Sequence, residues 1–119
     1  MKYLFLAPMI LFCSMLMAQN ESPIEVGQKV IIDNDKMKVV EHTSISQGEV
    51  CGAGMHSHEP HLTVVLTDAK VLITPENGES QEIEAKSGSS FWFGASETHT
   101  AINAGYKPIK MILVYLKEK

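Results

Sequence analysis

The sequence contains no arginine. All ten basic residues are lysines, they are set against 14 acidic residues, and the formal net charge is −4. Nucleic acids are bound through clustered positive charge, and arginine is the residue that recognises phosphates and carboxylates with two parallel hydrogen bonds. An acidic chain without arginine therefore argues against a nucleic-acid partner and disfavours sugar phosphates and nucleotide sugars as ligands.

Cysteine is scarce as well: the sequence contains two, Cys13 and Cys51. Cys13 lies within residues 1–18, where one lysine, a long apolar run and a closing alanine are typical of a secretory signal peptide. The apolar run from Tyr3 to Ala18 is shorter than the roughly 20 residues that span a bilayer. We therefore expect cleavage after Ala18, export to the periplasm or exterior of a bacterial cell, and no membrane association of the mature chain.

After such cleavage the chain has room for one domain. Residues 19–25 are predicted to be a flexible N-terminal segment and residues 26–119 to form the domain. A domain with Cys51 as its lone thiol has no internal disulfide, so its stability must come from packing. Cys51 has two interpretations: a small buried hydrophobic residue beside a glycine turn, or a reactive or metal-bound thiol, which its closeness to His56 favours.

Helical periodicity is missing too, and the sequence consists of short strand patterns separated by turn residues. Asn77-Gly78 is a strong hairpin signal, and turn signals recur at the spacing of an all-β sandwich or small barrel. Residues 109–117 are apolar on both strand faces, which indicates cover by a second sheet or by another subunit and so points towards a homodimer. The expected strands are residues 26–33, 37–45, 50–58, 61–67, 70–74, 81–85, 91–93, 98–103 and 109–117.

Histidines, in contrast, are clustered. Three of the five, His56, His58 and His61, fall within six positions. Side chains two residues apart on a strand point the same way, so the imidazoles of His56 and His58 are close enough to share one ion. Imidazole nitrogen suits zinc, copper, iron and nickel. Alone, the pair fits either a metal site or two solvated surface residues.

Residues 88–103 resemble the second of the two sequence motifs of the cupin superfamily. The glycine, histidine and asparagine of that motif are present at full spacing, and turn-forming residues occupy its proline and second glycine positions. The corresponding residues are Gly88, His99, Asn103, Gly94 and Ser96. The histidine pair resembles the first motif, so the similarity to small single-domain cupins runs from about residue 48 to residue 103.

This resemblance implies an all-β fold, a cupin-type jelly-roll barrel (double-stranded β-helix) in a single domain. It also implies that His56, His58 and His99 point inward and bind one divalent metal ion, with iron, zinc, manganese, nickel and copper as candidates. Three imidazole ligands leave coordination positions open for substrate, water or dioxygen.

The first motif departs from the family pattern because its usual glutamate would fall near Leu62 or Thr63. Leu62 is expected to face the core instead. His61 has two interpretations: a surface residue at the start of a strand, or a fourth ligand if the preceding turn shifts the phase of the strand. His42 is expected to be an ordinary strand residue.

Two functions stay open, beside a structural dimer module in which the histidines would be incidental. The first is a metal-dependent enzyme, dioxygenase- or isomerase-like, that acts on a small organic molecule. The second is a barrel that binds a small ligand or a metal without turnover. An enzyme needs a group for proton transfer near the open metal position, and the missing glutamate leaves none that is convincing. An apolar cavity wall with the hydroxyls of Thr63, Thr98 and Thr100 would suit a small neutral or aromatic ligand.

Overall fold

The computed structural model describes residues 24–118, which form nine strands and no helix. Within these residues there is no helix that is long and apolar enough to cross a membrane. The predicted signal peptide, residues 1–18, and most of the predicted flexible segment lie outside the described residues. The strands are β1 (Gly27–Asp33), β2 (Met37–Ser44), β3 (His56–His58), β4 (His61–Val65), β5 (Ala69–Pro75), β6 (Gln81–Ala85), β7 (Ser90–Phe93), β8 (Glu97–Asn103) and β9 (Ile109–Leu116).

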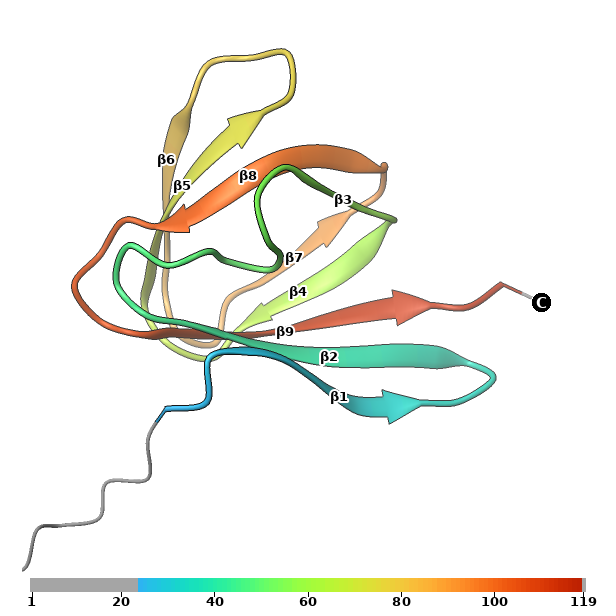
Figure 1. The fold of residues 1–119 in the computed structure, drawn as a ribbon. Helices are drawn as coiled ribbons and strands as arrows, with labels where there is room; N and C mark the ends of the chain where they lie inside the picture. Colours follow the sequence, from blue (N-terminus) through green and yellow to red (C-terminus); the bar gives the residue numbers. More distant parts are fainter. Residues whose placement is uncertain (1–23, 119) are drawn as a thin grey trace, which may run out of the picture.

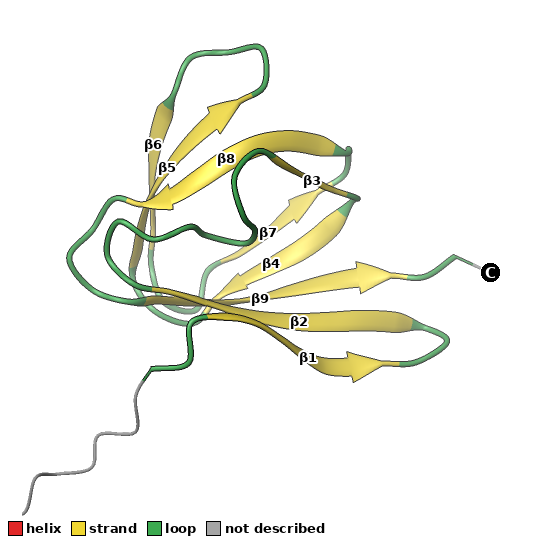
Figure 2. Cartoon of the chain, in the orientation of Figure 1, coloured by secondary structure: helices red, strands yellow, loops and turns green. Residues whose placement is uncertain are grey.

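The strands form two antiparallel sheets, and from β2 onward the chain passes back and forth between them (Figures 1 and 2). The five-stranded sheet has the order β1-β2-β9-β4-β7, and the four-stranded sheet has the order β3-β8-β5-β6. Most pairs join strands that are far apart in sequence, such as β2 with β9 and β3 with β8. This winding is a double-stranded β-helix, so the prediction of a single all-β jelly-roll domain is confirmed.

The predicted strands agree with the observed ones to within three residues at each end, except for residues 50–58. There a strand forms only at His56–His58, and residues 51–55 form a loop. The cause is the backbone, because Cys51 and Gly54 have φ angles of 57° and 54°. Such left-handed conformations cannot continue a pleated strand.

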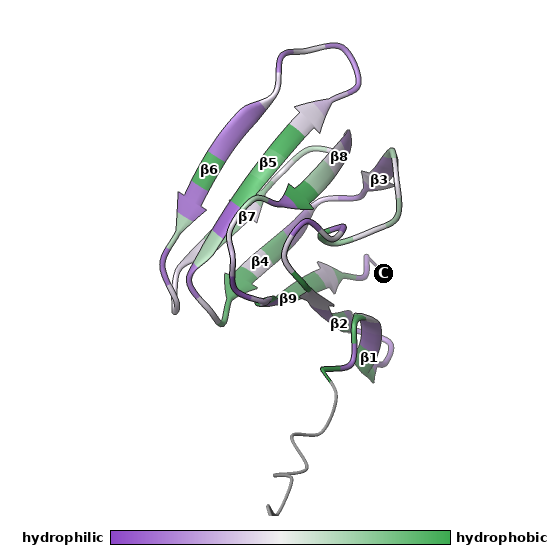
Figure 3. Cartoon of the chain, turned by 60° about the vertical axis from the view of Figure 1, so that its left-hand side comes forward, coloured by the Kyte–Doolittle hydropathy of each residue, from purple (hydrophilic) through white to green (hydrophobic). Residues whose placement is uncertain are grey.

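The apolar core fills one end of the barrel. Along β4 the inward residues change from His61 through Thr63 to Val65, and along β9 they change from Tyr115 through Leu113 towards Ile109. Figure 3 shows hydrophobic residues concentrated on β4, β5 and β9, whereas β6 is mostly hydrophilic. Polar side chains therefore gather at the other end. The buried core residues are Val50, Val65, Ala69, Val71, Ala101, Ile109, Met111 and Leu113.

The outer face of the five-stranded sheet is apolar as well. On β9, Ile112 and Val114 are half-buried and Leu116 is exposed, while the residues between them face the core. Strand register aligns five apolar side chains across the whole sheet, and we call this line the outer apolar row. It consists of Ile32, Val39, Val114, Leu62 and Trp92.

Candidate metal centre

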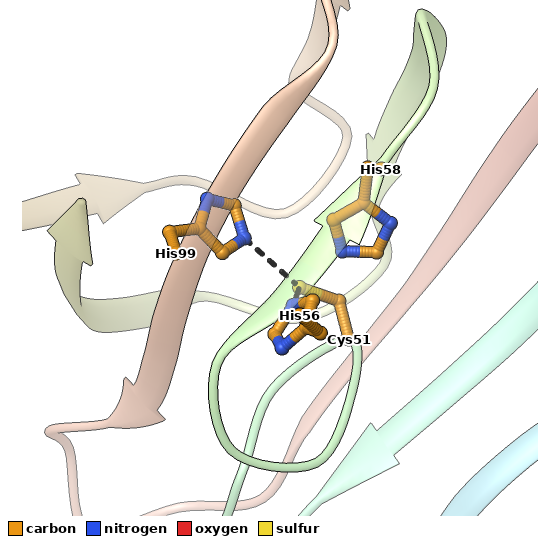
Figure 4. A group of neighbouring side chains, drawn as sticks. All are labelled: Cys51, His56, His58 and His99. Atoms are coloured by element: carbon orange, nitrogen blue, oxygen red, sulfur yellow. Dashed lines mark hydrogen bonds between the residues drawn. The ribbon is translucent and has the colours of Figure 1, made fainter. Parts of the chain in front are cut away.

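Four side chains bring potential metal ligands together at the polar end of the barrel. Cys51, His56, His58 and His99 each offer one nitrogen or sulfur atom, and these atoms all lie within 4.8 Å of one another. Figure 4 shows Cys51 reaching towards the rings from the loop before β3. Its Sγ lies 3.4 Å from His56 Nε2 and 3.8 Å from His99 Nε2. The structure thus brings together the three histidines that the motifs single out, with a cysteine among them.

Strand pairing explains how the histidines meet. β3 pairs with β8 so that His56 lies directly opposite His99, and His58 follows two residues later on the same face. His58 and His99 are each only 7% exposed. Ring centroids in the trio are 4.7 to 5.4 Å apart. Two neighbouring strands therefore hold three imidazoles in a space that one ion would fill.

The loop before β3 turns the thiol towards these rings. Cys51 adopts a left-handed backbone conformation, which costs a residue with a side chain roughly 1–2 kcal/mol. The neighbouring Gly52 lies against His56, because a Cβ added there would be 2.7 Å from the ring's Cγ. A residue without a side chain is therefore required for the loop and the His56 ring to pack this closely.

Hydrogen bonds at Nδ1 orient two of the rings. His56 Nδ1 lies 2.9 Å from the Gly54 carbonyl oxygen. A carbonyl can only accept, so Nδ1–H donates and Nε2 keeps its lone pair, directed at Cys51. His58 Nδ1 lies 2.7 Å from the Tyr115 hydroxyl, while His58 Nε2 is buried without a hydrogen-bond partner among the described residues. An imidazole anchored through one nitrogen and free at the other is the arrangement that metal ligands use.

Burial disfavours the charged forms of His58, His99 and Cys51. It lowers the pKa of His58 to about 4, with the neighbouring histidines adding to the effect. Burial and His56 also lower the pKa of His99, against the opposing charge of Glu97, whose Oε2 lies 3.7 Å from His99 Nδ1. Burial, with a smaller contribution from Glu97, raises the pKa of the Cys51 thiol to about 12. Neutral imidazoles are ready to bind a cation, and a bound cation deprotonates a coordinating thiol.

His61 is buried beside the cluster but does not belong to the group of mutually close ligand atoms. Only 4% of it is exposed, so the surface interpretation is wrong. Its Nδ1–H donates to the Glu59 carbonyl at 2.7 Å, and its ring stacks on Phe93 at 5.2 Å. The fourth member of the group of close ligand atoms is therefore Cys51, and not His61 as sequence reasoning allowed.

The phase of β4 also differs from the prediction. His61, Thr63 and Val65 face inward, and Leu62 and Val64 face outward. The reason is that the chain changes sheets between β3 and β4, so the alternation begins anew at His61. Because both faces of this strand are apolar, the pattern of hydrophobic residues did not reveal its phase.

His42 is a strand residue, as expected, but the sequence did not show that it is buried beside the cluster. It lies on the inward face of β2, is 6% exposed and lines the cavity beside the cluster. Burial, with smaller contributions from His56 and His61, lowers its pKa to about 4. The sequence carried no signal for this position, because the phase of β2 is set by its pairing with β9.

A cavity of about 1240 Å³ adjoins the cluster. Besides cluster residues it is lined by Lys38, Val40, His42, Trp92 and Tyr115, among others. Thr63 is buried but is not among the lining residues, and neither are Thr98 and Thr100. They alternate on β8 with the buried His99 and Ala101, so they face away from the barrel interior.

The two sheets and the inward-facing histidines define the chain as a cupin-type barrel, and comparison with solved structures agrees. A cupin domain from Bordetella pertussis is 25% identical, with a TM-score of 0.70 over 79% of this chain and 97% of that one. An RmlC-like cupin with a double-stranded β-helix from Methanocaldococcus jannaschii is 8% identical, with a TM-score of 0.64 over 82% and 84%. A polyketide cyclase from Streptomyces resistomycificus is 22% identical, with a TM-score of 0.57 over 80% and 70%. No protein-family model and no curated protein matches the sequence. The chain is a small cupin domain, as its motifs predicted.

Proposed function

We propose that the protein is an exported cupin that binds one divalent transition-metal ion through His56, His58 and His99. The observation that carries this proposal is His58 Nε2, which is buried beside the other ligand atoms and has no hydrogen-bond partner among the described residues. A buried polar atom without a partner costs about 1–3 kcal/mol. An ion at the centre of the cluster would use that lone pair.

The donor set supports a transition metal over calcium or magnesium, which prefer oxygen ligands. Iron, zinc, nickel, copper and manganese remain the candidates, and imidazole suits the first four best. The signal-peptide pattern of residues 1–18 supports export.

Purification of the full chain after expression with its own N-terminus tests both parts. Elemental analysis should find about one transition-metal ion per chain in the wild type and none in a His56→Ala, His99→Ala double variant. His61→Gln is the matched control and should keep its metal, because His61 is a buried histidine outside the ligand group. Intact mass should show loss of residues 1–18. A wild type that holds no more metal than the double variant refutes metal binding, and an uncleaved cytoplasmic chain refutes export.

A second function is turnover of a small organic molecule, dioxygenase- or isomerase-like. The cavity next to the cluster favours it, as does the likeness to a polyketide cyclase. Dioxygen uptake and product formation by the metal-loaded protein with small phenols and keto acids test this function. Substrate-dependent uptake that the double variant lacks would support it, and its absence across both substrate classes would favour binding without turnover.

A further inference from the structure

We infer that Cys51 is the fourth ligand of the proposed metal, so that the centre is a closed site of one thiolate and three imidazoles. The inference rests on the proposed metal binding and adds to it the coordination number and the chemical class of the ion. The cysteine thereby takes over the role for which the first motif would normally use a glutamate.

The distances around the sulfur favour a tetrahedral site. Zinc bonds of about 2.3 Å to sulfur and about 2.05 Å to nitrogen place the two ligand atoms about 3.6 Å apart at a tetrahedral ion, but about 3.1 Å apart when adjacent at an octahedral one. Cys51 Sγ lies 3.4 Å from His56 Nε2 and 3.8 Å from His99 Nε2. The two distances lie on either side of the tetrahedral value, so a four-coordinate ion requires little movement of these side chains.

A second observation points to the same ion. His58 Nε2 is buried and unpartnered among the described residues, on a side chain that is only 7% exposed. Its ring is held in the cluster by the Nδ1 contact with Tyr115. Four donors from a loop and two strands therefore lie within 4.8 Å of one another, and the sulfur is the fourth of them.

A sulfur ligand changes which metals fit and what the site does. Thiolate favours zinc, cobalt and copper over manganese or magnesium. On binding, the Cys51 S–H bond breaks, the sulfur electron pair enters the metal bond, and the proton passes to solvent. Four protein ligands leave a tetrahedral ion no open position, which is the mark of a structural site. Of the two functions left open by the sequence, the closed site favours metal binding without turnover.

Cobalt(II) is the probe that reports the sulfur directly. We would titrate it into the metal-free protein expressed with Cys13→Ser, so that Cys51 is its one thiol whether or not residues 1–18 are cleaved. A cysteine ligand gives a sulfur-to-cobalt charge-transfer band in the near ultraviolet, and four-coordination gives intense visible bands. Cys51→Ser should abolish the charge-transfer band and weaken zinc binding at least about tenfold in a chelator competition. Ala53→Ser places the same hydroxyl on the same loop at an exposed position and should change neither.

The outcomes separate this inference from the metal proposal itself. Cobalt that binds without the charge-transfer band, with equal zinc affinity in Cys51→Ser, overturns the thiolate ligand and leaves the three-histidine site intact. Failure of the wild type to bind either metal overturns both. The wild-type spectrum decides the question even if Cys51→Ser folds poorly, and Cys51→Ala provides a second variant.

Discussion

Gly52 determines whether the Cys51 loop and the His56 ring can occupy adjacent space. In a Gly52→Ala variant the new Cβ would lie 2.7 Å from His56 Cγ, 2.9 Å from Cδ2 and 3.0 Å from Nδ1. Real Cβ atoms essentially never approach within 3.0 Å, so either the loop or the ring must move. The backbone φ of +156° is also one that residues with side chains rarely adopt.

The size of the effect follows from these two penalties. Overpacking typically costs about 1–3 kcal/mol, and a disfavoured positive φ costs roughly 1–2 kcal/mol. If the ring stays in place, the free energy of unfolding of the metal-free protein should fall by about 2–5 kcal/mol. If the ring swings away instead, it loses its bond to Gly54 and its place as a ligand, and zinc affinity should fall at least about 100-fold.

Gly54→Ala is the matched control, because Gly54 is in the same loop and also has a positive φ, +54°, but has nothing within 4 Å of an added Cβ. Its free energy of unfolding should fall by the backbone penalty alone, roughly 1–2 kcal/mol, and it should bind zinc as the wild type does. Urea unfolding of the metal-free proteins and zinc competition against a chelator measure both quantities. Equal stability and equal affinity in the two alanine variants would refute the close packing of Gly52 on His56.

Three further predictions test the surroundings of the site and the outer face. Tyr115→Phe removes the partner of His58 Nδ1, so zinc affinity in the competition assay should fall about 10- to 100-fold, and unchanged affinity would show that the contact does not orient the ring. His42 has a pKa lowered to about 4 by burial, so the unfolded chain takes up the proton first and stability should fall as pH drops from about 6.5 to 4, by at most about 3 kcal/mol. Urea unfolding of metal-free His42→Gln should lose this component, and a curve like that of the wild type would contradict the assignment. Finally, we propose that the outer apolar row of one chain packs against the same row of a second chain in a homodimer. Sedimentation equilibrium should find a dimer, and Trp92→Glu, within the row, should dissociate it. Tyr106→Glu is the control and should leave the dimer intact, because Tyr106 is 98% exposed and lies outside the row. A monomeric wild type would disprove it.

The fold was largely predictable because its signals are local. Turn residues mark where strands end, and the predicted strand 81–85 coincides with β6 at Gln81–Ala85. The spacing from Gly88 to Asn103 is informative for a physical reason. Gly88 takes a φ of +88° at a turn, and Asn103 is fully buried, accepting from Gly105 N and donating to the Lys107 carbonyl. Between these two structural positions, β8 directs His99 inward.

The phases of individual strands were less predictable. Either Leu62 or His61 can face inward on β4, but not both. The greater hydrophobicity of Leu62 favoured the wrong choice, because His61 is the inward residue. What decides is pairing, because Thr63 lies opposite the buried Leu113 while Leu62 lies opposite Val114 on the outer face. The outer apolar row makes such errors unavoidable from one sequence, since a strand that is apolar on both faces carries no alternation to read.

The fourth ligand was hidden for a related reason. A carboxylate on β4 would have stood out in the sequence as a candidate ligand. The inward residue at the start of β4 is instead His61, which donates to the Glu59 carbonyl and stacks on Phe93. The donor comes instead from a loop whose φ angles follow no period, with Cys51 at 57° and a glycine directly after it. The missing glutamate, the two glycines of residues 52–54 and the lone cysteine of the domain are therefore parts of one arrangement.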